Sequence, residues 1–153
     1  MRENLTAGEI CSREVTIAFR TTALAGAARL MRDSHVGCLV VVDEVQGQRL
    51  VVGILTDRDI VTAAHAFDLP LASTCVQDVM RNDLVTVREQ DSLIDIMRVM
   101  RFKGVRRIPV VDAVGELQGL VTLSDVLEIL TEEMNLLVAA IHAGGERERA
   151  LRR

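Results

Sequence analysis

The sequence contains two copies of a short motif whose residues could bind a polar ligand. One copy reads Gly53-Ile54-Leu55-Thr56-Asp57-Arg58-Asp59-Ile60 and the other Gly119-Leu120-Val121-Thr122-Leu123-Ser124-Asp125-Val126. In each, an aspartate follows a threonine where an apolar strand gives way to a helix. The carboxylate can accept both vicinal hydroxyls of a ribose, while the hydroxyl and the free helical N–H groups can bind phosphate. The same division between an acid and a helix end occurs in dinucleotide-binding folds.

The same residues also have a purely structural interpretation. Thr56 and Thr122 are good N-cap residues, and Asp59 and Asp125 favour the positive end of a helix. A single motif of this kind is usually no more than a cap. Repetition at equivalent places favours the binding interpretation, as does the glycine before each threonine, which lets another group approach the backbone.

The residues around each motif are repeated too, which predicts a doubled structure. Each copy has a short apolar strand, a helix with one apolar stripe, two β-rich runs joined by an Asp- and Gly-containing turn, and a second helix that begins at Thr-x-x-Asp. We therefore expect an α/β (α+β) fold of two β-α-β-β-α repeats related by a pseudo-twofold axis, with matched clefts. The expected strands are Val15–Ile17, Cys38–Val42 and Leu50–Leu55, then Leu84–Val87, Ile108–Val111 and Leu117–Val121, and the first helix of each copy covers 24–31 and 93–100.

Smaller signals refine this picture. The second copy is three residues shorter in the turn that corresponds to Asp43–Leu50, which places one insertion there. Asp91 and Ser92 can cap the helix that follows them. Pro109 cannot donate a ladder hydrogen bond, so we expect it at a strand start or edge. The uninterrupted branched residues of the β-rich runs predict strands that are covered on both faces.

The last helix of the second copy is predicted to be longer than its counterpart. Its apolar residues continue at alternating spacings of three and four, a heptad-like seam of Leu127, Leu130, Met134, Leu137 and Ile141. This seam either packs on its own domain or forms a helix–helix dimer contact, and Gly144-Gly145 is expected to end it. The predicted organisation is repeat 1 at 9–66, a linker at 67–74, repeat 2 at 75–131, a helical extension at 132–143 and a mobile charged tail at 144–153.

Composition excludes several classes of protein. The 153 residues carry a net charge of −4 and include three Phe but no Trp or Tyr, which disfavours nucleic acid as a partner. No signal peptide and no apolar run of about 18 residues is present, so we expect no membrane association. Cys11, Cys38 and Cys75 are odd in number and widely spaced, and they support neither a disulfide framework nor a zinc site. Together these features predict a soluble, cytoplasmic protein.

The doubled motif, together with Arg106-Arg107-Ile108-Pro109-Val110-Val111-Asp112, resembles tandem cystathionine-β-synthase-type (CBS) domains of the short bacterial stand-alone kind. The resemblance extends from about Glu9 to Leu130. It implies a Bateman module with two clefts for adenosine-containing ligands such as AMP, ADP, ATP or S-adenosylmethionine. In that comparison Asp59 and Asp125 hold riboses. Thr56 and Thr122 lie at the ribose or phosphate, and Arg106 and Arg107 reach phosphate oxygens.

The two copies differ where these arginines occur. The first copy has Gly37-Cys38 in place of Arg106-Arg107, so Arg58 or a partner chain would have to supply its positive charge. We therefore expect unequal sites, with the Asp125 cleft the better nucleotide site. The alternative is that the arginines form a solvated basic face near Glu89 and Asp95.

No catalytic machinery is evident. Asp57 and Asp59 are better explained as capping residues than as an acid–base pair, and His35, His65 and His142 lack metal-ligand spacing. We predict a non-enzymatic sensor, without cofactor or metal, whose adenosine ligand changes the shape or the dimer geometry of the module. Its output is read by a separate protein effector or by a homodimer. The alternative is a structural interaction or dimerisation module with empty nucleotide clefts.

Overall fold

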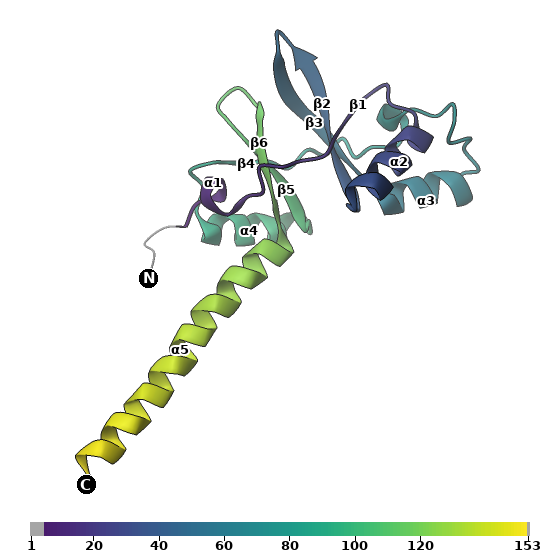
Figure 1. The fold of residues 1–153 in the computed structure, drawn as a ribbon. Coiled ribbons are helices and arrows are strands. Elements are labelled where there is room, and N and C mark those ends of the chain that lie inside the picture. Colours follow the sequence, from purple (N-terminus) through teal and green to yellow (C-terminus); the bar gives the residue numbers. More distant parts are fainter. Residues whose placement is uncertain (1–4, 153) are drawn as a thin grey trace.

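A computed structural model of the protein describes residues 5–152. Figure 1 shows two halves side by side, each built of a small sheet with helices against it, and one long helix that projects away from them. The elements in chain order are α1 (Ala7–Ile10), β1 (Ile17–Phe19), α2 (Leu24–Ser34), β2 (Cys38–Val45), β3 (Gln48–Thr56), α3 (Asp57–His65), η1 (Val76–Asp78), β4 (Val87–Arg88), α4 (Leu93–Lys103), β5 (Arg107–Val111), β6 (Leu117–Thr122) and α5 (Leu123–Leu151).

The predicted α/β fold of two β-α-β-β-α repeats is confirmed. Each repeat forms a three-stranded sheet, of order β1-β2-β3 in the first and β4-β5-β6 in the second. The first strand pairs parallel to the second, and the second and third form an antiparallel hairpin. The first strand of each repeat starts later than expected, at Ile17 and at Val87.

The predicted insertion lengthens the first hairpin. Gln46 and Gly47 at its tip both have positive φ angles, of 50° and 80°, which is the backbone that a tight two-residue hairpin turn requires. β2 and β3 therefore pair as far as Val45 and Gln48, whereas β5 already ends at Val111.

The expectation for Pro109 is wrong, because this residue lies in the middle of the central strand β5. Pro109 is opposite Leu120 of β6, and both backbone groups of Leu120 bond to Ser12 on the far side. This is therefore a non-hydrogen-bonded pair, and the ring nitrogen faces away from β6. On the other side, β4 pairs with β5 only from Val110 onward, whereas in the first repeat the equivalent Val40 N–H donates to the Thr16 carbonyl, so the proline lacks this one bond.

Both faces of the strands are buried, as the branched residues predict. Leu39 and Val41 of β2 pack with helices α2 and α3 in the first core, and Ile108 and Val110 have the same place in the second. The alternate residues Val40 and Val42 face a third cluster, which also contains Val51 and Val111 and joins the two repeats. The sheets are thus packed against each other, and the strand ends of one repeat lie close to those of the other.

The repeats exchange the segments that precede their first strands. α1 packs in the core of the second repeat, where Ala7 N–H donates to the backbone carbonyl of Asp91 and Gly8 N–H donates to that of Glu89. In the same way η1 belongs to the first core, where Val76 N–H donates to Thr22. Figure 1 shows α1 beside α4, far from its own repeat. Each core is therefore completed by chain from the opposite side of the duplication.

The last helix does not end where the glycines predict. α5 runs from Leu123 to Leu151 and passes through Gly144-Gly145 without a break. Residues 144–151 of the predicted tail are therefore helical, and Arg153 lies outside the described residues. The helix extends beyond both cores, with its far end in open space (Figure 1).

Candidate ligand-binding site

The two Thr-x-x-Asp motifs form identical helix caps. Thr56 Oγ1 accepts a hydrogen bond from Asp59 N–H (3.2 Å), and Asp59 Oδ2 accepts from Thr56 N–H (2.8 Å) and from the Thr56 hydroxyl (2.9 Å). The corresponding distances at Thr122 and Asp125 are 3.3, 2.7 and 2.9 Å. The structural interpretation of the motif is therefore correct for both copies.

Capping leaves part of each carboxylate available. In residues 5–152 both hydrogen bonds to each aspartate end on Oδ2, and Oδ1 of Asp59 and of Asp125 has no hydrogen-bond partner. Both side chains are half-buried, so each presents one acceptor oxygen at a helix N-terminus. Capping and ligand binding are thus compatible functions of the same residue.

The glycine before each threonine accommodates the exchanged segments rather than a ligand. A Cβ atom at Gly119 would lie 2.5 Å from Cys11 Sγ and 2.8 Å from the Ser12 carbonyl oxygen. At Gly53 it would lie 3.0 Å from the Arg81 carbonyl oxygen. The expectation that another group approaches the backbone here is correct, and the group is another part of the chain.

A cleft of about 460 Å³ opens at the first motif, and both repeats line it. We call it the Asp59 pocket. The first repeat contributes the end of β3 and the start of α3, and the second contributes the segment before β4 and the loop that leads into β5. Its lining residues are Ile54, Thr56, Asp57, Arg58, Asp59, Arg81, Asp83, Leu84, Val85, Gly104, Val105, Arg106 and Arg107.

The Asp59 pocket is rich in unpaired positive charge. It contains four arginines and three aspartates, and in the described chain the guanidinium groups of Arg58, Arg81, Arg106 and Arg107 form no salt bridge or hydrogen bond. Other arginines of the protein are paired, such as Arg13 with Glu89 at 2.7 Å and Arg98 with Asp95 at 3.4 Å. Arg106 and Arg107 form no ion pair with Glu89 or Asp95, but both are exposed, so the structure is also compatible with the alternative of a solvated basic face.

Arg107 lies where the two repeats meet. Its Nη2 is 3.8 Å from the position that a Cβ atom would occupy at Gly37, and Asp57 Oδ2 is 3.2 Å from the same point. Burial raises the pKa of the neighbouring Cys38 thiol, the Arg107 guanidinium opposes that rise, and Asp57 adds to it. The guanidinium thus lies beside the first repeat although the residue belongs to the second.

Asp125 lies in a different environment. It lines a groove of about 720 Å³ between α5 and the chain around α1, together with Leu5, Glu9, Ile10, Glu128, Ile129, Glu132, Glu133, Leu136 and Leu137. Five of these ten side chains are carboxylates and none is basic. Such a groove repels phosphate.

The grouping of site residues expected from the sequence is therefore wrong in one respect. Thr56, Arg58 and Asp59 lie together with Arg106 and Arg107, whereas Thr122 and Asp125 do not. The sequence reasoning assigned each arginine to its own copy, but the packing of the two sheets turns the start of β5 toward the motif of the other copy. The reason to expect the better nucleotide site at Asp125, which was the presence of the two arginines, therefore no longer applies.

Sequence reasoning also missed part of the pocket wall. Arg81, Asp83, Leu84 and Val85 enter the pocket because the chain before β4 is exchanged, and Arg81 pairs with Ile54 of β3. The one available signal is that Cys75-Val76-Gln77-Asp78 and Thr6-Ala7-Gly8-Glu9 stand at equivalent distances before the two copies. That periodicity shows an extra element in each repeat but not where it packs.

Other kinds of site are not evident in residues 5–152. No group of three or more His, Cys, Asp or Glu side chains there could hold a metal ion. Cys11, Cys38 and Cys75 are free thiols. In the same residues no helix, α5 included, combines the length and the apolar character needed to cross a membrane.

Comparison with known proteins identifies the family. The family model described as "CBS domain" matches residues 7–66 and 76–132. Hypoxic response protein 1 of Mycobacterium tuberculosis is 32% identical over 127 residues, which cover 83% of this chain and 86% of that protein. The chain spans only 63% of an uncharacterised protein of Methanopyrus kandleri, to which it is 30% identical over 126 residues, or 82% of its own length.

Solved structures agree with this assignment. The structure of Hypoxic Response Protein I, described with two coordinated zinc ions, superposes with a TM-score of 0.71 at 30% identity and covers 81% of this chain and 98% of that one. The CBS domain pair of protein MJ0100, in complex with 5′-methylthioadenosine and S-adenosyl-L-methionine, has a TM-score of 0.73, with 85% and 98% coverage. At 22% identity this second likeness concerns the fold alone. CBS domain pairs are generally regulatory modules that bind ligands, and this chain, with its two matched repeats, belongs to the CBS domain family.

Proposed function

We propose that the protein is a non-enzymatic sensor that binds an adenine nucleotide in the Asp59 pocket. The observation that carries the proposal is the set of four unpaired arginines in a cleft that also holds a capped helix N-terminus and a free carboxylate oxygen. A volume of about 460 Å³ is within the usual range for small-molecule sites.

Each part of a nucleotide has a chemically matched wall in this pocket. Asp59 Oδ1 is the acceptor for the ribose hydroxyls, and the Thr56 hydroxyl lies beside it. Arg58, Arg106 and Arg107 are the donors for phosphate oxygens, for which guanidinium groups are well suited. An adenine ring would lie between the apolar side chains of the lining, which are Ile54, Leu84, Val85 and Val105.

The charge of the pocket favours phosphorylated ligands among those that the resemblance implies. With all groups ionised, four arginines against three aspartates leave a net charge of +1 in the lining. AMP, ADP and ATP are anions, whereas S-adenosylmethionine carries a sulfonium cation. We therefore expect the affinity to rise with the number of phosphates and S-adenosylmethionine to bind more weakly.

The pocket also suggests how binding becomes a signal. Its walls come from both repeats, so a bound nucleotide bridges them and favours whichever arrangement of the repeats fits it better. A ligand can shift such an equilibrium only by its difference in affinity for the two arrangements. The shift is read by a separate effector protein or through a homodimer.

Calorimetric titration of the full chain with ATP, AMP, S-adenosylmethionine and NAD tests the proposal. The duplication supplies a matched control, because Asp59→Ala and Asp125→Ala remove the same cap from equivalent helices. We expect Asp59→Ala to weaken ATP binding by about a hundredfold and Asp125→Ala to leave it within about twofold. Equal losses in the two variants, or a loss only in Asp125→Ala, would contradict the assignment.

A second function, that of an interaction module with empty clefts, is favoured by one feature. The apolar side chains of α5 are exposed over most of its length, as a helix built for a protein contact would show. The absence of binding heat for every ligand, from protein shown to be folded by circular dichroism, would favour this alternative.

A further inference from the structure

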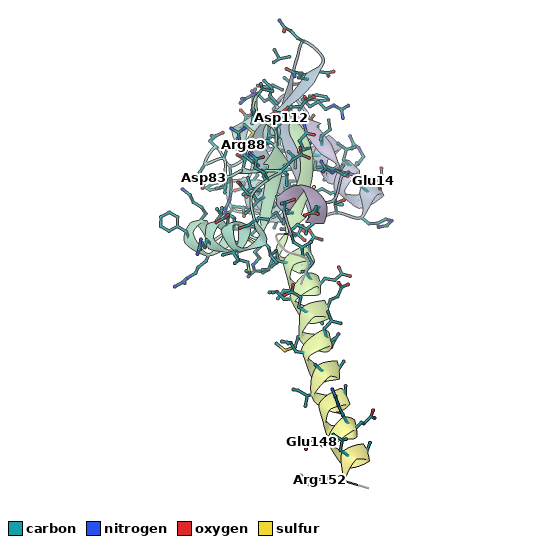
Figure 2. All side chains as sticks on the ribbon, turned by 90° about the vertical axis from the view of Figure 1, so that its left-hand side faces the viewer. Glu14, Asp83, Arg88, Asp112, Glu148 and Arg152 are labelled. Carbon is teal, nitrogen blue, oxygen red and sulfur yellow. The ribbon has the colours of Figure 1, made fainter. Side chains whose placement is uncertain are left out.

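The part of α5 that projects from the module has no contact that buries it. Every residue from 131 to 152 is exposed, and Figure 2 shows the side chains of this part of the helix pointing into open space up to Glu148 and Arg152. Large apolar side chains are among them, including Leu137 at 62% and Ile141 at 73% exposure. Most helices owe their stability to packing of an apolar face, so this one is incomplete as a single chain.

The glycines in α5 strengthen the same point. Gly144 and Gly145 are poor helix formers, yet the helix continues through them for six more residues. Among residues 5–152 no other element packs on this stretch. A helix with this sequence and no tertiary contact would fray, and a partner that packs along it explains its continuation.

A mainly apolar seam runs along the whole length of α5, although Leu136 and Val138 are exposed outside it. Positions that alternate by three and four residues run along a single side of a helix pair. In α5 they are Leu127, Leu130, Met134, Leu137, Ile141, Gly144, Glu148 and Leu151. Six of these eight are large and apolar, and all six are exposed. The seam therefore fits another helix with a matching seam.

The distribution of charge along α5 distinguishes a parallel from an antiparallel pair of copies. From Leu123 to Ile141 every charged residue is acidic, namely Asp125, Glu128, Glu132 and Glu133. All arginines of the helix, Arg147 and Arg149, follow the glycines, where they alternate with Glu146 and Glu148. A parallel pair places acid against acid and arginine against arginine, whereas an antiparallel pair places the acidic part of one copy against the arginines of the other.

We propose that α5 pairs antiparallel with α5 of a second copy of this chain. In the register that aligns the two seams over their whole length, Leu137 packs against Ile141 of the second copy and Leu127 against Leu151. Met134 then packs against Gly144, where the missing side chain leaves room for it.

The same register fixes one ion pair. Glu133 and Arg147 precede seam positions on the same side, and in an antiparallel pair such flanking positions face each other across the two helices. Each dimer thus contains two Glu133–Arg147 contacts between copies. Glu148, the one charged seam residue, faces Leu130 of the second copy in this register.

The proposed α5 pairing depends on the proposed function in one respect only, which is that a homodimer could report ligand binding. Its test therefore uses the full chain without nucleotide, so that its failure leaves the titration of the Asp59 pocket unaffected. Sedimentation velocity over a range of concentrations gives the dimer dissociation constant of each variant.

The first comparison is between two adjacent leucines. Leu137→Asp places a carboxylate in the seam and is expected to raise the dissociation constant by about a hundredfold. Leu136→Asp changes a neighbouring exposed leucine that lies outside the seam, about 100° away around the helix, and is expected to change the dissociation constant by less than about threefold. A wild-type protein that is monomeric throughout, or a dimer insensitive to Leu137→Asp, overturns the proposal.

The second comparison fixes the orientation. Glu133→Arg and Arg147→Glu are each expected to weaken the dimer by about tenfold, and the double variant is expected to recover most of the loss. Glu132→Arg, one residue away and facing solvent in this register, is the matched control and should have little effect. Failure of the double variant to recover overturns the antiparallel register.

Discussion

The two helix starts that carry the Thr-x-x-Asp motif are alike in backbone and different in surroundings. Thr56 with Asp59 and Thr122 with Asp125 form the same caps to within about 0.1 Å. The four arginines of the Asp59 pocket, however, have Ser12, Gly37, Cys38 and Ser124 at the equivalent positions of the other copy. The two copies thus share the residues that determine the fold, whereas they differ in the residues that could bind a charged ligand.

This difference teaches that the function of a repeat cannot be assigned from its own residues. The cap of α3 belongs to the first repeat, but Arg81, Arg106 and Arg107 come to it from the second. Charge that appears to belong to one copy acts in the other. We therefore expect one strong nucleotide site in each chain rather than two.

Removal of positive charge from the Asp59 pocket is expected to have the largest effect of the changes considered. Arg106→Ala with Arg107→Ala is expected to weaken ATP binding by about a hundredfold and AMP binding by less, because fewer phosphate oxygens lose their donors. Calorimetry of the double variant measures both. Arg98→Ala with Arg101→Ala, which removes two arginines outside the pocket, is the control. An equal loss in the control would show that the effect is only one of net charge.

The next largest effect is expected when the two motif glycines are replaced by alanine, and the loss of stability should differ between them. Gly119→Ala forces a Cβ atom against Cys11 Sγ at 2.5 Å and the Ser12 carbonyl at 2.8 Å, and we expect it to lower the free energy of unfolding by about 2 kcal/mol. Gly53→Ala meets its neighbours at 3.0 Å, one of them the flexible Met80 side chain, so about 1 kcal/mol is expected. Urea denaturation of both variants gives the order, and the reverse order would contradict this account of the segment exchange.

The two caps should be equal in the absence of ligand. Thr56→Ala and Thr122→Ala each remove the same hydrogen bonds, so each is expected to lower the free energy of unfolding by about 1 kcal/mol. With saturating ATP only the Thr56→Ala protein should also lose part of the ligand-induced stabilisation. Thermal unfolding with and without ATP measures this, and an identical response of the two variants to ATP would remove the proposed difference between the sites.

A third cap, at the start of α4, lies outside the Asp59 pocket and serves as a reference for the other two caps. The Ser92 hydroxyl donates to Asp95 Oδ2 at 2.6 Å, and this bond holds the pKa of the Asp95 carboxyl below its usual value. The folded state therefore binds the proton less tightly than the unfolded one, so the stabilisation is present above the ordinary pKa of about 3.8 and is lost as the pH falls below it.

Asp95→Asn should accordingly cause a small loss of stability at pH 7 that disappears near pH 3. Urea denaturation at the two pH values measures it, with the exposed Glu132→Gln as a control. Because Asp95 is exposed, this is the smallest of the expected effects. A loss that persists unchanged at pH 3 would exclude the carboxylate as its origin.

Much of this fold is predictable from the sequence because it depends on local signals. The apolar stripe of α2, the Ser92 cap of α4 and the turn at Gln46-Gly47 follow from periodicity and backbone preference. The doubled pattern then predicts the β-α-β-β-α order of each repeat, which the structure confirms.

What the sequence does not predict depends on contacts between distant segments. Pro109 occupies a central strand because Leu120 bonds outward to Ser12, a partner more than 100 residues away in the chain. The charge of the Asp59 pocket depends on how the sheets pack, which no periodicity encodes. Gly144-Gly145 indicates a helix end on local propensity alone, yet α5 continues through both glycines.

The exchanged segments make the duplication indivisible. A chain that held only one repeat would have α1 or η1 attached to the wrong side of its core, and it could bury that segment only by swapping it with a second molecule. Fusion of two repeats replaces this bimolecular step by an intramolecular one, whose effective concentration is set by the short connection between them. The two cores should for this reason melt in a single cooperative transition, because neither is complete until the other has folded.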